Sequence, residues 1–455
     1  MNERQKHTGL FDPLFISAEM REVFCDERRL QSMLDFEAAL ARALARTGIA
    51  PASAAQPIEA QCQASLFSME ALAQESSLAG NLASPLIKAL TNLVARDNER
   101  AAGYVHWGAT SQDVIDTGMV LQLRAALAIF ERDLTALTAS LARLAVEHSS
   151  TLVAGRTWLQ QGPPVTMGLK AAGWLDALGR HRSRIRETSK RVLTLQFGGA
   201  VGTLAAFGNR GLEVAAALAK ELKLALPEAP WHSHRDRFAE VATTLGLFTG
   251  TLGKMARDIS LLSQTEVGEA HEPSAPGRGG SSTMPHKRNP VGSAVALAAA
   301  IRVPALVSTM LASMVQEHER GLGGWQAEWE TLPEICLLAS GALTRISEVV
   351  DGLEIDASRM DQNLNDTHGL FLAEAVAYAL APKIGRLPAH DLIEQACRHA
   401  QNQKRPLLEI LLENPKVREF LSPGDLAHLL APGNFMGSAE QIVKNVLSEY
   451  ESGKT

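Results

Sequence analysis

Apolar residues are regularly spaced in the middle of the chain. From Val120 onward they recur at alternating steps of three and four residues over about seven helical turns. The members of this series are Val120, Leu123, Leu127, Phe130, Leu134, Leu137, Leu141 and Leu144. Because three or four residues complete about one turn of an α-helix, the series predicts one long helix with a continuous apolar seam.

Two further segments have similar spacing. One series runs from Val241 to Leu262 at the same steps, and another, from Met167 to Val192, approximates them. The intermediate members are Leu245, Phe248, Leu252, Met255 and Ile259 in the first and Ala171, Trp174, Leu178 and Ile185 in the second. Three long amphipathic helices indicate a bundle. No convincing run of alternating strand positions is present, so we predict an all-α fold with a long central helical bundle flanked by two smaller helical domains.

Three glycines, Gly246, Gly250 and Gly253, interrupt the Val241–Leu262 series. Each would destabilise an exposed helix by roughly 1 kcal/mol relative to alanine. We therefore interpret them as positions where another helix approaches closely.

The apolar pattern changes twice along the chain. Residues 1–111 have a shorter period and more loops, and a break near residues 351–358 precedes a proline-rich final segment. We predict an N-terminal helical domain of residues 1–111, a central bundle of residues 112–355 and a C-terminal helical domain of residues 356–455. A chain of 455 residues is long enough for several cores.

The overall charge argues against a nucleic-acid-binding or membrane-surface protein. The formal net charge is −6 and the pI about 6.1, with no basic stripe. The beginning of the chain lacks an apolar signal core, and the most apolar run, from Val291 to Ile301, stops at Arg302. We expect no nucleic-acid partner and no membrane span.

The cysteines give no sign of a metal or disulfide framework. The four of them, Cys25, Cys62, Cys336 and Cys397, are widely separated and form no Cys-x-x-Cys pair. We therefore expect no bound metal and a cytoplasmic location.

The segment from Gly279 to Pro290, GGSSTMPHKRNP, is the most informative for function. Glycines at its start give backbone freedom and prolines restrict it, while two hydroxyls, two cations and an amide lie between them. An ordinary polar surface loop would also fit this composition. A loop that closes over a ligand is the functional alternative.

This segment resembles the signature loop of the fumarase/aspartase superfamily, Gly-Ser-Ser-x-Met-Pro-x-Lys-x-Asn-Pro, at every fixed position. Two other segments are similar to conserved regions of the same superfamily. They are residues 106–113, HWGATSQD, followed by Asp116 and Thr117, and residues 155–160, GRTWLQ. The three segments occur in the superfamily's order.

The resemblance implies an all-helical subunit that assembles into a homotetramer, with each active site shared between subunits. It also implies a cofactor-free reaction on a small carboxylate substrate, through a carbanion stabilised as an aci-carboxylate. By position in the signature, Ser281 would exchange the carbon proton, while Lys287 and Asn289 would stabilise the intermediate. Lys287 could otherwise be a solvated surface lysine.

Further polar residues match superfamily positions that contact the substrate. These are Thr110, Ser111, Thr157, Gln160, Ser282 and His106. Helix caps and local hydroxyl–backbone bonds would explain each hydroxyl equally well taken singly. His106 could equally be a hydrogen-bonded core residue.

Trp158 departs from the pattern of many relatives, which have a histidine there that protonates the leaving group. Tryptophan has no titratable nitrogen, so an amine leaving group would lack its proton donor. A carboxylate leaving group needs none, because carboxylic acids ionise near pH ~4. The departure therefore points to the superfamily's lactone-forming cycloisomerases of protocatechuate catabolism (the β-ketoadipate pathway), with Ser281 as the single proton donor and Trp158 as an apolar wall.

A cycloisomerase of this kind would bind a tricarboxylate, so several cations must converge on it. The segment 317–330, EHERGLGGWQAEWE, resembles this branch, and we expect Arg320 to reach a substrate carboxylate. Arg156, Arg278 and Arg288 are further candidates, which the sequence does not rank.

Three alternatives remain at this stage. An adenylosuccinate lyase or another lyase of the superfamily would share the signature loop, and Trp158 argues against it. A non-catalytic helical protein would not need Ser281 and Lys287. A di-iron bundle would need Glu-x-x-His repeats, which the sequence lacks.

Overall fold

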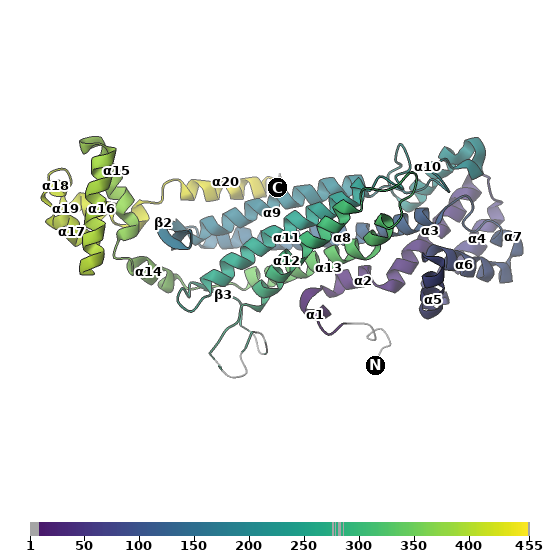
Figure 1. Ribbon diagram of the computed structural model, residues 1–455, viewed down its shortest axis with the longest axis horizontal. Helices are drawn as coiled ribbons and strands as arrows, with labels where there is room; N and C mark the ends of the chain where they lie inside the picture. The colour runs from purple at the N-terminus through teal and green to yellow at the C-terminus, as the bar shows by residue number, and fades with distance from the viewer. Residues whose placement is uncertain (1–8, 275–276, 278, 281–283, 285, 454–455) are drawn as a thin grey trace. The chain divides into compact units, whose positions relative to one another are not determined.

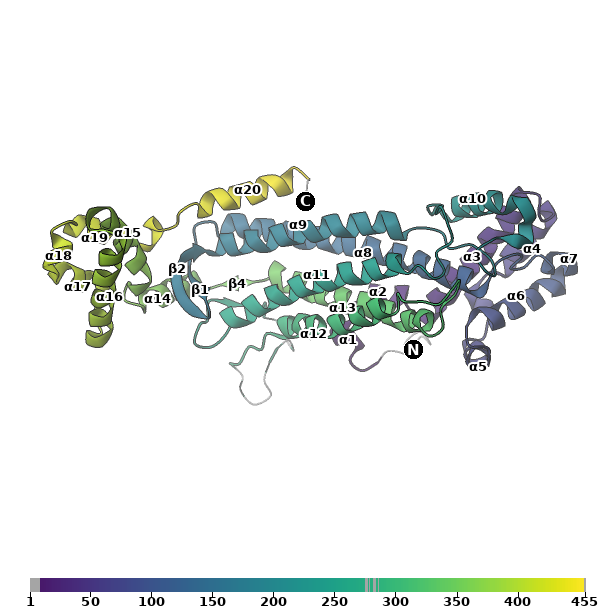
Figure 2. The same ribbon diagram turned by 45° about the horizontal axis from the view of Figure 1, so that its top comes forward.

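The computed structural model describes residues 9–274, 277, 279–280, 284 and 286–453. Among these residues, five helices of 22 or more residues run side by side in both views (Figures 1 and 2). They are α8 (Ser111–Glu147), α9 (Met167–Val192), α11 (Asp236–Leu262), α12 (Val291–Ala312) and α13 (Gly324–Asp351). The predicted all-α fold with a long helical bundle is confirmed.

The three apolar series lie in α8, α9 and α11, and every member of each series is buried. Spacing alone was sufficient here because each seam repeats over several turns. The sequence analysis did not identify α12 and α13 as long helices.

The glycines of α11 mark close contacts at two of the three expected positions. A Cβ built on Gly253 would come within 2.5 Å of Ala300 Cβ, and one on Gly246 within 3.0 Å of Val307 Cγ2, both on α12. A Cβ on Gly250 would meet no atom within 4 Å, so the interpretation was wrong for that residue.

The chain divides into two compact units, and the boundary between them falls inside all five long helices. The first comprises the described residues of Met1–Leu134, His181–Gly253 and Val295–Thr344. The second comprises those of Thr135–Arg180, Lys254–Ala294 and Arg345–Thr455. The three sequence domains remain a prediction, although α8 begins at Ser111, next to the first expected boundary.

The first unit contains the short N-terminal helices together with its parts of the long ones. Its additional elements are α1 (Asp12–Phe15), α2 (Ala18–Val23), α3 (Asp26–Arg46), α4 (Ala52–Gln61), η2 (Ala64–Leu66), α5 (Met69–Ala79), α6 (Ala83–Asp97), α7 (Glu99–Ala102), η3 (Ala205–Arg210) and α10 (Gly211–Leu222). The long helix α3 packs against α4 and α10 and buries a continuous apolar face.

The second unit contains the C-terminal helices and the short strands. Its additional elements are β1 (Leu152–Thr157), β2 (Gln160–Thr166), β3 (Ala270–His271), β4 (Glu354–Ile355), α14 (Ala357–Asn365), η4 (Leu370–Leu372), α15 (Ala373–Ile384), α16 (Arg386–Gln403), α17 (Leu407–Glu413), α18 (Pro415–Arg418), α19 (Pro423–Leu429), η5 (Pro432–Asn434) and α20 (Ala439–Glu451). One apolar core joins α15, α16, α17 and α19.

The hairpin β1–β2 was not expected from the sequence. Its antiparallel strands have a register shift after Ala154, and Trp158 and Leu159 form the connecting turn with φ values of 54° and 64°. Both residues lie in the left-handed region, as a two-residue hairpin turn requires. The hairpin thus places Trp158 at its tip.

Candidate active site

The base of the signature loop is closed by a backbone hydrogen bond. The amide of Asn289 donates to the carbonyl of Gly279 at 3.0 Å. Gly279 has φ +66°, and a Cβ on it would lie 2.6 Å from the Asn289 carbonyl oxygen. Glycine is therefore required at this position. Ser281, Ser282 and Arg278 lie outside the described residues.

Lys287 and Asn289 line the same polar cavity of about 200 Å³. The described residues around it also include Ser263, His271, Glu272, Arg288 and the loop glycines Gly277 and Gly280. An ammonium and a carboxamide that face one cavity are suited to hold an anion. The structure thus brings together two of the three residues expected to be catalytic.

A buried carboxylate fixes the point where the loop enters α12. Glu272 accepts hydrogen bonds from the amides of Gly292 at 2.9 Å and Ser293 at 2.7 Å. These are unpaired N–H groups of the first helical turn, where a negative charge is also favoured by the helix dipole. Glu272 therefore sets the geometry of the loop's C-terminal end.

Arg288 supports the loop and is already paired. Its guanidinium donates to both carboxylate oxygens of Glu354 at 2.8 Å and to the carbonyl of Glu272 at 2.6 Å. The hydrogen bond from Arg288 lowers the pKa of Glu354. Arg288, one of the candidate cations, is thus held in a structural role by its ion pair with Glu354.

Arg156 is likewise held by a carboxylate. It donates to both oxygens of Glu269, at 2.8 and 2.6 Å, and Asn363 donates to the same carboxylate at 2.7 Å. Glu269 is fully buried. Because removing one member of a buried ion pair leaves a charge uncompensated, we interpret Arg156 as an anchor of the hairpin.

The residues at the tip of the hairpin are exposed. Thr157 pairs with Gln160 across the turn, and both side chains face solvent in the single chain. Trp158 is 97% exposed. Among the described residues, little of the chain therefore covers this indole.

Lys170 is a cation near the hairpin that the sequence analysis did not identify. Burial is the main cause that lowers the pKa of Lys170, and the positive charges of Lys254 and Arg156 act in the same direction. Lys170 lies on α9 among the apolar residues of the Met167–Val192 series, and nothing in that pattern indicated a function for it.

In the first unit, a buried aspartate organises the segment that carries Thr110 and Ser111. Asp113 accepts hydrogen bonds from the amides of Thr110 (3.0 Å), Gly198 (3.0 Å) and Gly199 (2.9 Å). His232 Nε2 lies 2.7 Å from the same carboxylate. Asp113 therefore fixes the start of α8 to the 198–199 loop and leaves the two hydroxyl residues half-buried at the surface.

His106 is paired with a buried glutamate. Its Nδ1 lies 2.6 Å from Glu37 Oε1. Burial opposes a charge on the ring, but the carboxylates of Glu37 and Asp113 outweigh this effect and raise the pKa of His106. The charge of a protonated His106 is therefore compensated by the carboxylate of Glu37.

Arg320 contacts the same loop that Asp113 holds. Its guanidinium donates to the carbonyl of Ala200 at 2.9 Å. Hydrogen bonds therefore run from Arg320 through the 198–200 segment to Asp113 and Thr110. The structure brings Arg320, Thr110, Ser111 and His106 to one region of the first unit.

A buried ion cluster lies behind this region, and no sequence signal indicated it. Arg235, only 1% exposed, donates to Asp116 at 2.6 and 3.1 Å and to Glu328 at distances of 2.5 to 3.1 Å. Trp325 Nε1 donates to Asp116 at 3.0 Å. Since Asp116 is on α8 and Glu328 on α13, the cluster holds together the helices next to Ser111 and Arg320.

The cluster contains one cation and two carboxylates. Burial raises the pKa of Glu328 to about 7, the charge of Asp116 adds to this effect, and Arg235 opposes it. The protonation state of Glu328 is therefore sensitive to pH near neutrality.

The family models place the chain in a known group of enzymes. Residues 16–305 match the model described as "Lyase", and residues 369–446 match "Adenylosuccinate lyase C-terminus". With the helical bundle, the signature loop and the cavity lined by Lys287 and Asn289, these matches define the class. The chain belongs to the fumarase/aspartase superfamily of lyases.

Several relatives of the chain share one name. The chain is 58% identical to the 3-carboxy-cis,cis-muconate cycloisomerase of Pseudomonas aeruginosa, over 97% of this chain and 96% of the relative. It is 52% identical to the enzyme of the same name from Bradyrhizobium diazoefficiens, over 97% and 98% of the two chains. The crystal structure of the 3-carboxy-cis,cis-muconate lactonizing enzyme from Pseudomonas putida superposes with a TM-score of 0.94 at 53% identity, covering 98% of this chain and all of that one.

Proposed function

We propose that this protein catalyses the closure of 3-carboxy-cis,cis-muconate to the γ-lactone 4-carboxymuconolactone, a step of protocatechuate catabolism. The observation that carries this proposal is the similarity to cycloisomerases over almost the whole chain, at up to 58% identity among those described above. Trp158, in place of the histidine that many lyases of the superfamily use, agrees with a carboxylate nucleophile.

The chemistry needs one new C–O bond and one proton. A carboxylate oxygen of the substrate attacks the conjugated double bond and closes the ring, while the π electrons move to the neighbouring carbon and onto its carboxylate. Ser281 then donates its hydroxyl proton to that carbon and regains a proton from solvent. Lys287 and Asn289, which line one cavity, would stabilise the dianionic aci-carboxylate.

Substrate binding is assigned to two groups of residues. Thr110, Ser111, His106 and Arg320 form one group in the first unit, and the hairpin residues Thr157, Trp158 and Gln160 belong to the second, together with the loop residue Ser282. Arg320 would supply positive charge for a tricarboxylate, because Arg156, Arg288 and His106 are already paired with Glu269, Glu354 and Glu37, whereas Arg320 donates to a backbone carbonyl.

A shared active site is part of this proposal. We propose a homotetramer in which residues of different subunits complete each site; the exposed Trp158 supports this, because another subunit would cover it. The surface of α12 supports assembly: the helix is long and apolar enough to cross a membrane by length and composition, yet only 28% of its most apolar window is buried in the chain. Ile301 is 76% exposed on it. Burial of this face between subunits would explain the apolar surface.

The cytoplasm is the expected location. All four cysteines carry free thiols, which is typical of a reducing compartment. We propose that the reaction needs neither a cofactor nor a nucleic-acid partner.

The test of the function is to identify the product formed in D₂O. Incubation of the purified protein with 3-carboxy-cis,cis-muconate should give the lactone with a single deuterium at the protonated carbon, as seen by NMR. Recovery of unchanged diene would refute the proposal.

A further inference from the structure

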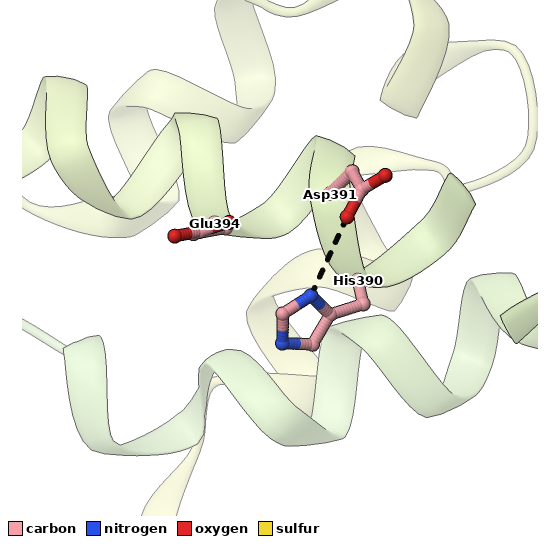
Figure 3. Close-up of side chains that lie close together, drawn as sticks. All are labelled: His390, Asp391 and Glu394. Carbon is pink, nitrogen blue, oxygen red and sulfur yellow. Dashed lines mark ion pairs between the residues drawn. The ribbon is translucent and has the colours of Figure 1, made fainter. Parts of the chain in front are cut away.

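Three side chains that can ligate a metal lie close together on α16. Their ligand atoms, from His390, Asp391 and Glu394, all lie within 4.8 Å of one another. Figure 3 shows the three side chains, with His390 Nδ1 3.6 Å from Asp391 Oδ1. Zn²⁺ binds histidine nitrogen and carboxylate oxygen at about 2.0–2.2 Å, so the three side chains must rotate toward one another to hold one ion.

The backbone beneath these side chains is well supported. His390 and Glu394 are four residues apart and so lie on one face of the helix. The neighbouring face of α16 is packed into the C-terminal core through Ala389, Ile393, Ala396 and Ala400. The exposed ligands are therefore presented by a rigid element, which limits the entropy lost when an ion binds.

The donor set selects a class of ion. Ca²⁺ and Mg²⁺ prefer oxygen ligands only, whereas one imidazole with two carboxylates suits zinc and similar divalent transition metals. The two carboxylates also neutralise the ion. Arg398 is the local competitor, since it donates to Glu394 Oε1 at 2.6 Å.

The position next to a cavity leaves room for further ligands. His390 and Glu394 also line a cavity of about 470 Å³ between α15 and α16, together with Tyr378, Arg386 and Cys397. An ion at this edge keeps open positions for water or an anion, which Arg386 would attract. We propose that His390, Asp391 and Glu394 bind one zinc-like divalent ion on the exposed surface of α16, at a site that uses none of the proposed catalytic residues.

The test is a calorimetric titration of tag-free, chelator-treated full-length protein with ZnCl₂. We expect one ion per chain. His390→Ala and Glu394→Gln should each weaken binding by at least about tenfold, because even loss of a residue that supports a metal ligand costs ~10–100-fold in affinity.

Two control variants on the same helix sharpen the test. His399→Ala removes another exposed histidine of α16 and should leave the affinity unchanged. Arg398→Ala should strengthen binding by up to about fivefold, since an exposed ion pair is worth about 0.2–1 kcal/mol. Absence of stoichiometric binding, equal affinity in His390→Ala, or weaker binding in Arg398→Ala would overturn the proposal. All four side chains are exposed, so these variants test binding and leave the core intact.

Discussion

At the scale of single residues, Ser281 carries the proposed proton transfer. Ser281→Ala removes the only proposed donor, so turnover should fall by at least about 100-fold, the lower range for general acid catalysis. Steady-state rates on the muconate substrate measure this. Lys287→Ala should also reduce turnover, through loss of charge stabilisation. Near-wild-type turnover of a folded Ser281→Ala variant would show that another group delivers the proton.

Trp158 tests the argument about the leaving group. Trp158→His should lower kcat/KM for lactonisation by about tenfold, the effect of one lost apolar contact in a pocket. Trp158→Phe is the matched control, because it keeps an apolar ring at the tip of the hairpin and should retain most activity. Faster lactonisation by Trp158→His would mean that the position has been misinterpreted.

Glu328 gives a stability prediction with a defined sign. Its pKa in the folded protein, about 7, lies above the ordinary value of 4.5. The contribution of Glu328 to the free energy of unfolding is therefore fully present below about pH 4.5. It is lost as pH rises through 7, by at most about 3 kcal/mol. In Glu328→Gln this loss should disappear, so the melting temperature should fall less between pH 5 and pH 8 than in wild type. An identical pH dependence in both proteins would rule out Glu328 as its source.

At the scale of elements, the sequence predicted what repeats locally. The seams of α8, α9 and α11 were found because each repeats over several turns. In the structure every member of the three seams is buried. The hairpin β1–β2 was missed, because its strands contain Gly155, Pro163 and Pro164 and its turn is Trp158-Leu159, not the usual Asn-Gly.

The candidate site was predictable to the extent that its residues lie within a motif. Lys287 and Asn289 were expected to act together and line one cavity. The partners of Arg235 could not be found in this way, because Asp116 and Glu328 lie 119 and 93 residues away from it. The same holds for Glu272, which caps α12 from 20 residues upstream. Such contacts depend on tertiary packing, and no local spacing encodes them.

At the scale of the whole molecule, the shared active site predicts complementation between inactive variants. Ser281→Ala and Thr110→Ala lie in different segments of the proposed site. If those segments come from different subunits, mixed assemblies formed by refolding both variants together should contain some sites with neither substitution. They should recover a measurable fraction of wild-type turnover.

The control is a mixture of Ser281→Ala with Lys287→Ala. Both substitutions lie in the same loop, so every site that receives this loop from either variant is damaged and no activity should return. Light scattering should show tetramers in both mixtures. Equal activities of the two mixtures would show that each chain builds its own site.

The most direct measurement of the central claim is a comparison of substrates with the wild-type protein. The ultraviolet absorbance of 3-carboxy-cis,cis-muconate would be followed beside adenylosuccinate, argininosuccinate and fumarate, with a chelator present. The proposed function predicts rapid loss of the diene absorbance with the muconate alone. Turnover of adenylosuccinate without turnover of the muconate would contradict it, and with it the inference from Trp158 that the leaving group is a carboxylate.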